Sequence, residues 1–220
     1  MSPANVRRPD RHALHAGPRG RLDWRLLLDW LREDGWIAAE DVDRVAKRLS
    51  AGASTLHALV RLGGAGLVRR DVAGGARPLD VEALTEWLAT RAQLPYLRID
   101  PLKADAGRVA EVMSAQYAQL RLALPVKVGA AEVTIATAEP FDVGWVAEIE
   151  NHLRRAVKLV VANPEELRRY TGEFYALARS VRAAHKSGEV SASASFEQLV
   201  ELGKTKGQLD ANDQGVVQVV

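Results

Sequence analysis

The order of apolar and polar residues divides the chain into a helical part and a part that contains strands. Between residues 21 and 93, apolar residues recur every three or four positions, which is the period of an amphipathic helix. Three of them form the first stripe: Leu22, Leu26 and Trp30. Gly35 follows where a glycine commonly ends a helix, and the arrangement recurs once, with an insertion at residues 71–78. We therefore expect a small helical bundle built from a helix–turn–helix unit that is used twice.

The pattern changes after this helical part. Apolar runs at residues 122–128, 132–138 and 157–162 have the length and composition of strands. The three small residues between the first two runs predict a hairpin turn. Because helical spacing lies between and after these runs, the order of elements predicts a small two-layer α/β domain.

Local signals predict four further features. Residues 96–99 have the composition of a short strand, and residues 107–116 that of a helix. Asp142 is the expected N-cap of the next helix, because its carboxylate can accept a hydrogen bond from the first backbone N–H groups. Asn163 is followed directly by a proline and two acids, which predicts the start of a long final helix.

Together these elements predict an α+β fold with five segments. The segments are a disordered basic head (residues 1–20), a helical subdomain (21–93), an α/β domain (94–182), a linker (183–195) and the start of a next domain (196–220). The linker is recognised by its small and polar residues, with serine at alternate positions. Because the chain stops on an apolar run without a cap, we expect the last helix to be truncated.

Bulk composition is that of a soluble globular protein, with 47% hydrophobic and 26% charged residues. The net charge of +2 argues against a nucleic-acid-binding protein, which needs a concentrated positive surface. The chain contains no cysteine, so disulfides and cysteine-ligated zinc are excluded. No apolar run is long enough to span a membrane, and the N-terminus lacks the apolar core of a secretory signal. These features predict a cytoplasmic protein.

A search for catalytic motifs finds none. Residues 203–205 (Gly-Lys-Thr) end like a phosphate-binding loop, but that loop requires a glycine where this chain has Gln198. The five histidines are scattered, and no pair has the spacing of two metal ligands on one helix face. We therefore expect no catalytic residue, no metal site and no cofactor in this chain, and a free-standing enzyme is disfavoured.

Three stretches resemble the N-terminal domain of type II secretion E-type and type IV pilus extension ATPases. They are residues 94–102 (LPYLRIDPL), residues 124–126 (LPV) and residues 133–142 (VTIATAEPFD). The order of segments is similar as well, because a helical pair precedes the α/β domain and a closing helix and a linker follow it. The resemblance covers roughly residues 21–220.

The resemblance implies a non-catalytic docking and regulatory role. In this family the N-terminal domains attach a hexameric cytoplasmic ATPase to an inner-membrane platform protein, and the ATPase domains bind ATP and Mg²⁺. The expected partners are therefore the platform protein and the chain's own ATPase domains, which would lie downstream. The expected location is the cytoplasm, at the inner membrane through the partner.

A subset of this family binds cyclic di-GMP through a duplicated helical motif that resembles R-L-G-x-x-L-V-x-x-G. Counting back from the two helix-ending glycines places residues 26–28 (LLL) and 54–56 (STL) where R-L-G belongs. Arg25 and Arg61 lie close by but out of register, so they are weak candidates for a degenerate dinucleotide site. Losing an arginine that grips guanine or phosphate through two hydrogen bonds should cost roughly tenfold in affinity or more. A cyclic di-GMP sensor is therefore the alternative function, and it is disfavoured.

Candidate contacts with a protein partner lie on the first helical pair. They are Arg32, Glu33 and Trp36. Tryptophan and arginine are enriched at protein interfaces, and Trp36 follows the helix-ending glycine rather than continuing an apolar stripe. We therefore expect the exposed face of this helical pair to take part in docking.

Overall fold

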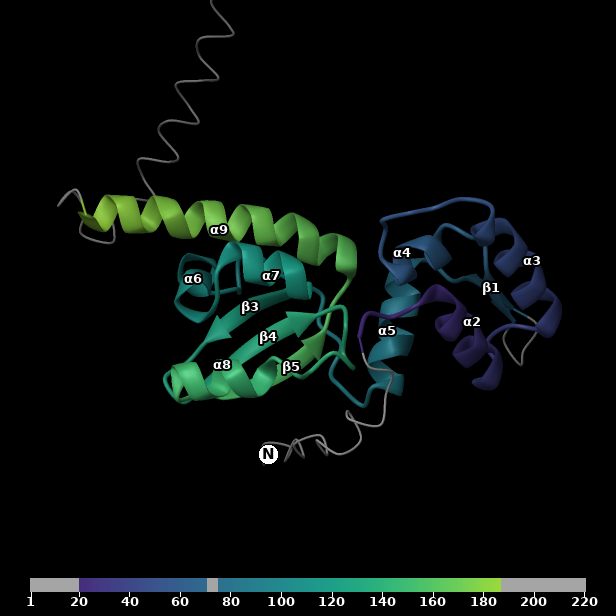
Figure 1. The fold of residues 1–220 in the computed structure, drawn as a ribbon, viewed down its shortest axis with the longest axis horizontal. Coiled ribbons are helices and arrows are strands. Elements are labelled where there is room, and N and C mark those ends of the chain that lie inside the picture. Colours follow the sequence, from purple (N-terminus) through teal and green to yellow (C-terminus); the bar gives the residue numbers. More distant parts are fainter. Residues whose placement is uncertain (1–19, 71–74, 187–220) are drawn as a thin grey trace, which may run out of the picture. The chain divides into compact units, whose positions relative to one another are not determined.

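The computed structural model describes residues 20–70 and 75–186, and its fold is α+β, as predicted (Figure 1). The chain divides into two units, Met1–Ala178 and Arg179–Val220. Of the second unit, only residues 179–186 are described, and they are helical. Most of the predicted head, most of the predicted linker and all of the predicted final helix lie outside the described residues.

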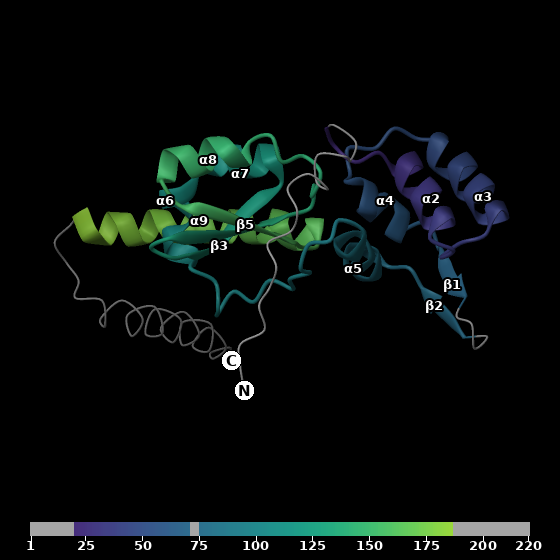
Figure 2. The same cartoon turned by 90° about the horizontal axis from the view of Figure 1, so that it is seen from below.

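Helices dominate residues 22–92, called here the helical region. Its described elements are α2 (Trp24–Glu33), α3 (Ala39–Ser50), α4 (Ala58–Gly63), β1 (Val68–Arg70), β2 (Ala76–Pro78) and α5 (Val81–Arg91). The helices follow one another as two pairs, and the second pair is interrupted by the antiparallel ribbon of β1 and β2 (Figure 2). This ribbon occupies the position of the insertion seen in the sequence, but the sequence pattern did not predict its strands.

Helix α2 buries a different face from the one predicted. Trp24, Leu27, Leu28 and Leu31 are buried. By contrast, Leu26 and Trp30 are only half-buried, so two members of the predicted stripe are not core residues. Three successive leucines span about 200° of a helix that turns by about 100° per residue. Their pattern therefore could not decide which side faces the core.

The predicted end of the first helix is confirmed at Gly35. Its φ of +70° lies in the left-handed region, which glycine adopts without strain. The N–H of Gly35 donates to the carbonyl of Arg32 at 3.0 Å, and the N–H of Trp36 donates to the carbonyl of Leu31 at 2.9 Å. These two bonds are those of a Schellman motif, and they satisfy carbonyls that the helix leaves free.

A second glycine allows α4 and α5 to approach closely. A Cβ atom at Gly63 would lie 2.7 Å from Cγ2 of Val81 and 2.8 Å from its backbone nitrogen. Both distances are shorter than a carbon atom tolerates, so only glycine fits at the end of α4 without displacing the start of α5. At its start, α5 is capped by Asp80, whose Oδ1 accepts from the N–H of Ala83 at 2.8 Å.

Residues 94–178, called here the sheet region, contain the strands predicted for the second domain. Its described elements are η1 (Ala106–Arg108), α6 (Val109–Val112), α7 (Ala115–Arg121), β3 (Ala123–Val128), β4 (Glu132–Thr137), α8 (Val146–Leu153), β5 (Ala156–Val161) and α9 (Pro164–Lys186), which continues beyond it. The sheet order is β3-β4-β5. Strands β3 and β4 are antiparallel, while β4 and β5 are parallel and are joined by α8.

The sheet is covered by helices. Helix α8 packs on β5, and α6 and α7 pack on β3 (Figure 1). The predicted hairpin turn is confirmed between β3 and β4, where the N–H of Gly129 donates to the carbonyl of Glu132 at 2.9 Å. Leu124 and Ile135, on the two adjacent strands, are completely buried, as expected of strands with apolar residues on both faces.

The predicted strand at residues 96–99 is not formed. Tyr96 makes only an isolated bridge beside Val161. The backbone still pairs briefly with the end of β5, because Val161 donates to the carbonyl of Pro95 and Leu97 donates to that of Val161, both at 2.8 Å. The segment therefore covers one end of the edge strand β5 without continuing as a strand.

Two helix predictions in this region are wrong in detail. The helix expected at residues 107–116 is interrupted at Met113, and Ser114 starts α7 instead, its hydroxyl accepting from Tyr117 N–H at 3.2 Å. Asp142 does not cap α8, which begins at Val146. The carboxylate of Asp142 instead lies 3.4 Å from the Arg121 guanidinium, so Asp142 forms an ion pair rather than the expected cap.

The start of α9 is as predicted. Oδ1 of Asn163 accepts from the N–H of Glu165 at 2.9 Å, and the helix begins at Pro164. The buried face of α9 includes Leu167 and Phe174. The helix continues to Lys186, so the first residues of the predicted linker are helical.

Candidate functional site

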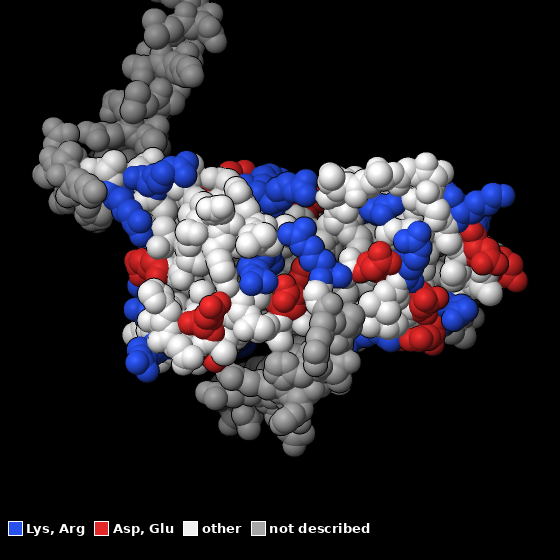
Figure 3. Space-filling view, in the orientation of Figure 1, with Lys and Arg blue, Asp and Glu red and all other residues white. Residues whose placement is uncertain are grey.

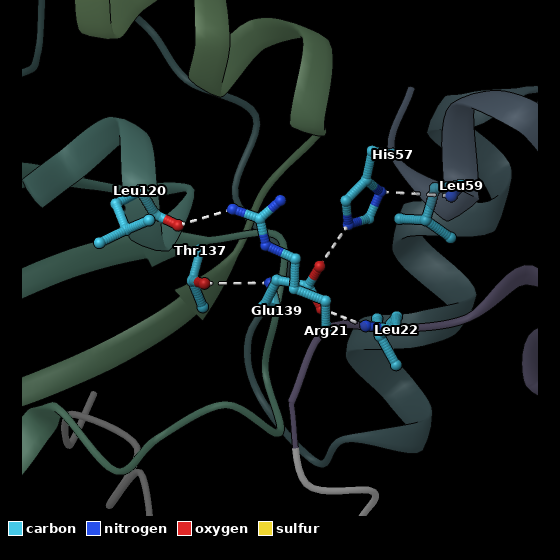
Figure 4. Close-up of polar contacts among 7 residues, drawn as sticks. All are labelled: Arg21, Leu22, His57, Leu59, Leu120, Thr137 and Glu139. Atoms are coloured by element: carbon cyan, nitrogen blue, oxygen red, sulfur yellow. Dashed lines mark hydrogen bonds and ion pairs between the residues drawn. The ribbon is translucent and has the colours of Figure 1, made fainter. Parts of the chain in front are cut away.

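The loop after β4 contacts the helical region through a buried carboxylate, that of Glu139 (Figure 4). Glu139 is 3% exposed. Its Oε2 accepts from the backbone N–H of Leu22 at 2.8 Å, and its Oε1 lies 3.1 Å from Nε2 of His57. Leu22 precedes α2 and His57 precedes α4, so the starts of both helical pairs meet at one side chain. We call these three residues the Glu139 contact.

The hydrogen bonds of His57 assign its tautomer. Its Nδ1 accepts from the N–H of Leu59 at 3.2 Å, which makes His57 the N-cap of α4. A nitrogen that accepts carries no proton, so the proton of the neutral ring is on Nε2, where it donates to Glu139. The contact is therefore a neutral imidazole that donates to a carboxylate, rather than an ion pair. It fixes the start of α4 to the loop after β4.

Two more contacts join the same regions. The ring of Phe141, two residues after Glu139, lies edge-on to Trp30 of α2 at a centroid distance of 5.4 Å. On α5, Glu82 accepts from the hydroxyl of Tyr96 and from the side-chain amide of Asn163. Burial, followed by the bond to Glu82, raises the pKa of the Tyr96 hydroxyl. The polar side chains of Tyr96 and Asn163 in the sheet region thus find their hydrogen-bond acceptor in the helical region.

A pocket of about 470 Å³ opens beside the Glu139 contact. Its walls come from the starts of α2 and α4, from α7 and from the second turn of α9. Arg21 and Arg168 contribute cationic groups, while the exposed Leu56 and the half-buried Leu122 contribute apolar surface. Arg21 donates to the carbonyl of Leu120 at 2.9 Å, which holds its guanidinium against α7.

The two weak dinucleotide candidates lie close together. The guanidinium of Arg25 is 4.2 Å from the centre of the Trp24 ring, and that of Arg61 is 5.3 Å from it. Arg61 also donates to the carbonyl of Leu49 at 2.8 Å, near the C-terminal end of α3. Trp24 is 4% exposed, so its ring offers little surface for a base to stack on. The arrangement ties α2, α3 and α4 together.

The three partner candidates lie around the end of α2, in different environments. Arg32 has a side chain that is 51% exposed, with Asp29 at 3.9 Å. Glu33 pairs with Arg91 of α5 at 2.9 Å. Trp36 is half-buried, with its ring centre 6.2 Å from that of Trp87. The side chains of Arg32 and Glu33 are thus similarly exposed, at 51% and 55%, and Glu33 is already paired with Arg91.

Sequence reasoning missed both side chains of the Glu139 contact. His57 was one of several scattered histidines, and histidine is not among the favoured N-cap residues, so no local signal singled it out. Glu139 lies within the stretch VTIATAEPFD, where an acid directly after a buried strand was a usable signal. Burial of a charged residue is rare unless it has partners, but burial appears only in the fold.

Neither a metal site nor a membrane span is found in residues 20–70 and 75–186. No group of three or more His, Asp or Glu side chains is placed to hold a metal ion within these ranges. No helix described there is long and apolar enough to cross a membrane.

Comparisons with known proteins find a family domain, a curated relative and a solved structure that resemble this chain. A protein-family model, the MshEN domain, matches residues 92–181. The type IV pilus assembly ATPase TfpB of Acinetobacter baylyi is 36% identical over 156 residues, which are 69% of this chain and 26% of that protein. The solved structure of MshE with cdg is 18% identical, with a TM-score of 0.48, and the match covers 68% of this chain and 98% of that one. The chain thus spans about a quarter of the length of the curated relative.

Proposed function

Because this chain carries an MshEN domain and belongs with the N-terminal regions of type IV pilus and type II secretion ATPases, we propose that it docks such an ATPase onto its machine. The partner is the inner-membrane platform protein, and the chain holds the ATPase at the cytoplasmic side of that membrane. An MshEN domain is not itself catalytic, so ATP and Mg²⁺ bind in domains downstream of it. The role of this chain is placement and regulation.

One observation carries this proposal: a non-catalytic domain matches residues 92–181, within a chain that aligns with only 26% of a pilus assembly ATPase. The rest of such a protein has room for the hydrolytic domains. The buried Glu139 contact adds a physical argument, since it fastens the helical region to the MshEN domain. A force applied to one region is then transmitted to the other.

Calorimetric titration tests the docking role directly. The chain would be titrated with the purified cytoplasmic region of the platform protein from its own machine, and ATP hydrolysis would be measured for the chain alone. We expect saturable binding and no hydrolysis. A folded chain, verified by circular dichroism, that binds no platform protein would contradict the proposal.

The alternative function is a cyclic di-GMP sensor, favoured by the convergence of Arg25 and Arg61 on Trp24. Against it, Arg61 already donates to the carbonyl of Leu49. In addition, the first copy of the motif has Leu26 where its arginine belongs and the buried Leu28 where its glycine belongs. Titration with cyclic di-GMP distinguishes the two: we expect no heat at micromolar ligand. Binding that disappears in Arg25→Ala would establish the sensor instead.

A further inference from the structure

We infer that the pocket beside the Glu139 contact binds an acidic, amphipathic segment of the protein partner, inserted between Arg21 and Arg168. The inference rests on the proposed docking function and names the chemistry of what docks. It follows from the charge of the pocket, from its apolar walls and from the lack of Phe, Tyr and Trp side chains in its described lining.

The pocket carries an excess of positive charge. Arg21 and Arg168 line it, and among the described residues of its lining the only acid is Glu139. The carboxylate of Glu139 is already engaged by Leu22 and His57, so it neutralises neither arginine directly. In the described part of the chain, the guanidinium of Arg168 has no acceptor and no counter-ion. On the face shown in Figure 3, further basic side chains lie along α9. A partner with negative charge is complementary to this surface.

Apolar surface in the same pocket favours a peptide. Leu56 is 49% exposed at the pocket, and Leu167 and Leu122 form part of its wall. A peptide with an aliphatic side chain next to an acidic one could contact Leu56 with the first and pair with Arg168 through the second. Burying an anchor of this kind in a pocket is the usual source of affinity at protein interfaces. The volume of about 470 Å³ suits one or two such anchors rather than a folded domain.

A nucleotide fits the pocket less well. Proteins hold bases by stacking them on aromatic rings or guanidinium planes. No Phe, Tyr or Trp side chain lines this pocket among the described residues. Arg21 is held against α7 through the carbonyl of Leu120, and the imidazole of His57 is occupied at both nitrogens. Among the described residues of its lining, the pocket therefore offers a base only the guanidinium of Arg168 to stack on, and otherwise charge and aliphatic contact.

Affinity measurements on the full chain test the inference. The probe is the purified cytoplasmic region of the platform protein, titrated at several NaCl concentrations. Arg168→Glu and Leu56→Ser each change an exposed or half-exposed residue, so the fold should persist. We expect each to weaken binding about tenfold. Arg179→Glu is the matched control, an exposed arginine of the same helix that does not line the pocket, and should change affinity less than about twofold.

The salt dependence of the affinity gives a second measurement. It would not change if Arg168 had only a structural role. The wild-type affinity should fall as NaCl rises, and the fall should be shallower for Arg168→Glu, because one ionic contact is missing. Reversing the sign of the complementary acid in the partner should restore binding to Arg168→Glu.

The outcomes separate the two proposals. If the wild-type chain binds no platform protein, the docking function fails and this inference fails with it. If it binds and all three variants bind equally well, docking stands and the pocket is not the site. Equal weakening by Arg168→Glu and Arg179→Glu would also overturn the inference, because it would show attraction by overall charge. Displacement of the partner by cyclic di-GMP, lost in Arg168→Glu, would make the pocket a nucleotide site instead.

Discussion

The sheet region and the helical region differ in what holds their backbone in place. In the sheet region, strands with apolar residues on both faces pair through backbone hydrogen bonds, and side chains such as Ile135 are completely buried. In the helical region, arginine side chains tie one helix to another: Arg61 donates to the carbonyl of Leu49, and Arg48 donates to that of Ala65. Acids contribute as well, since Asp34 accepts from the indole of Trp87 at 2.7 Å.

The family model matches only one of these two regions. The MshEN family model begins at residue 92, at the end of the helical region, and covers the sheet region. The helical region has a buried apolar core as well, which includes Leu27, Leu59 and Leu84. Each hydrogen bond from an arginine side chain to a backbone carbonyl is lost when that one arginine is replaced. The helical region should therefore be the part in which single polar substitutions change the behaviour of the chain.

The largest effect is expected in the middle of the sheet. Ile135→Ala removes three methyl or methylene groups from a completely buried position, and should lower the free energy of unfolding by about 2–5 kcal/mol. Urea denaturation followed by tryptophan fluorescence measures it. A loss no greater than that of Arg61→Ala would mean that the sheet core does not dominate stability.

Next comes the Glu139 contact, which joins the regions. Glu139→Ala leaves the N–H of Leu22 and Nε2–H of His57 without acceptors in a buried site, and should cost about 1–3 kcal/mol. Glu139→Gln keeps one acceptor and should cost less. If both variants were as stable as the wild type, the contact would not fasten the two regions.

Close packing of α4 on α5 gives the third prediction. Gly63→Ala should cost about 1–3 kcal/mol, because its Cβ would overlap the backbone of Val81. Gly64→Ala is the matched control: its Cβ would lie no closer than 3.6 Å to any neighbour, so stability should be unchanged or slightly higher. Thermal unfolding of the two variants compares them, and equal melting temperatures would refute the close approach.

Removing the hydrogen bond of Arg61 should have a smaller effect on stability. Arg61→Ala removes a part-buried hydrogen bond to the carbonyl of Leu49, and should cost about 1 kcal/mol. Arg25→Ala, which removes an exposed contact with the Trp24 ring, should cost about 0.5 kcal/mol. Urea denaturation of both variants tests this order, and the reverse order would show that the tie to α3 contributes little.

The smallest effect is a dependence on alkaline pH. Burial raises the pKa of the Tyr175 hydroxyl, which donates to the carbonyl of Met113 at 2.9 Å. The folded state thus keeps this proton up to a higher pH than the unfolded state, in which the pKa of tyrosine is about 10. The stability it contributes is complete below that pH and is lost as pH rises above it. Tyr175→Phe should make unfolding free energy fall less steeply above about pH 10, and an unchanged slope would contradict this.

Much of the sheet region could be predicted from the sequence, because its signals are local. Three apolar runs gave the strands, the small residues at 129–131 gave the hairpin, and Asn163 gave the start of α9. Where local signals competed, prediction was wrong. Asp142 has the chemistry of an N-cap, but its carboxylate pairs with Arg121, a residue that only the fold brings near.

The candidate site could be predicted only in part. Glu139 lay within a stretch that resembled the family, but its partners are more than 80 positions away in the sequence, and no periodicity connects them. Arg25 and Arg61 were singled out as arginines out of register, and their shared contact with Trp24 depends on how α2 and α4 pack. Long-range polar contacts of this kind carry no signal in a single sequence.

The docking claim is tested most directly inside the cell. A photo-crosslinking amino acid would replace Leu56 at the pocket in the full-length protein, and Leu102, which is 94% exposed and lines no part of the pocket, in a control. We predict a crosslink from position 56 to the inner-membrane platform protein, identified by mass spectrometry, and none from position 102. Crosslinks from neither position to any membrane component, while the machine is assembled and active, would contradict it.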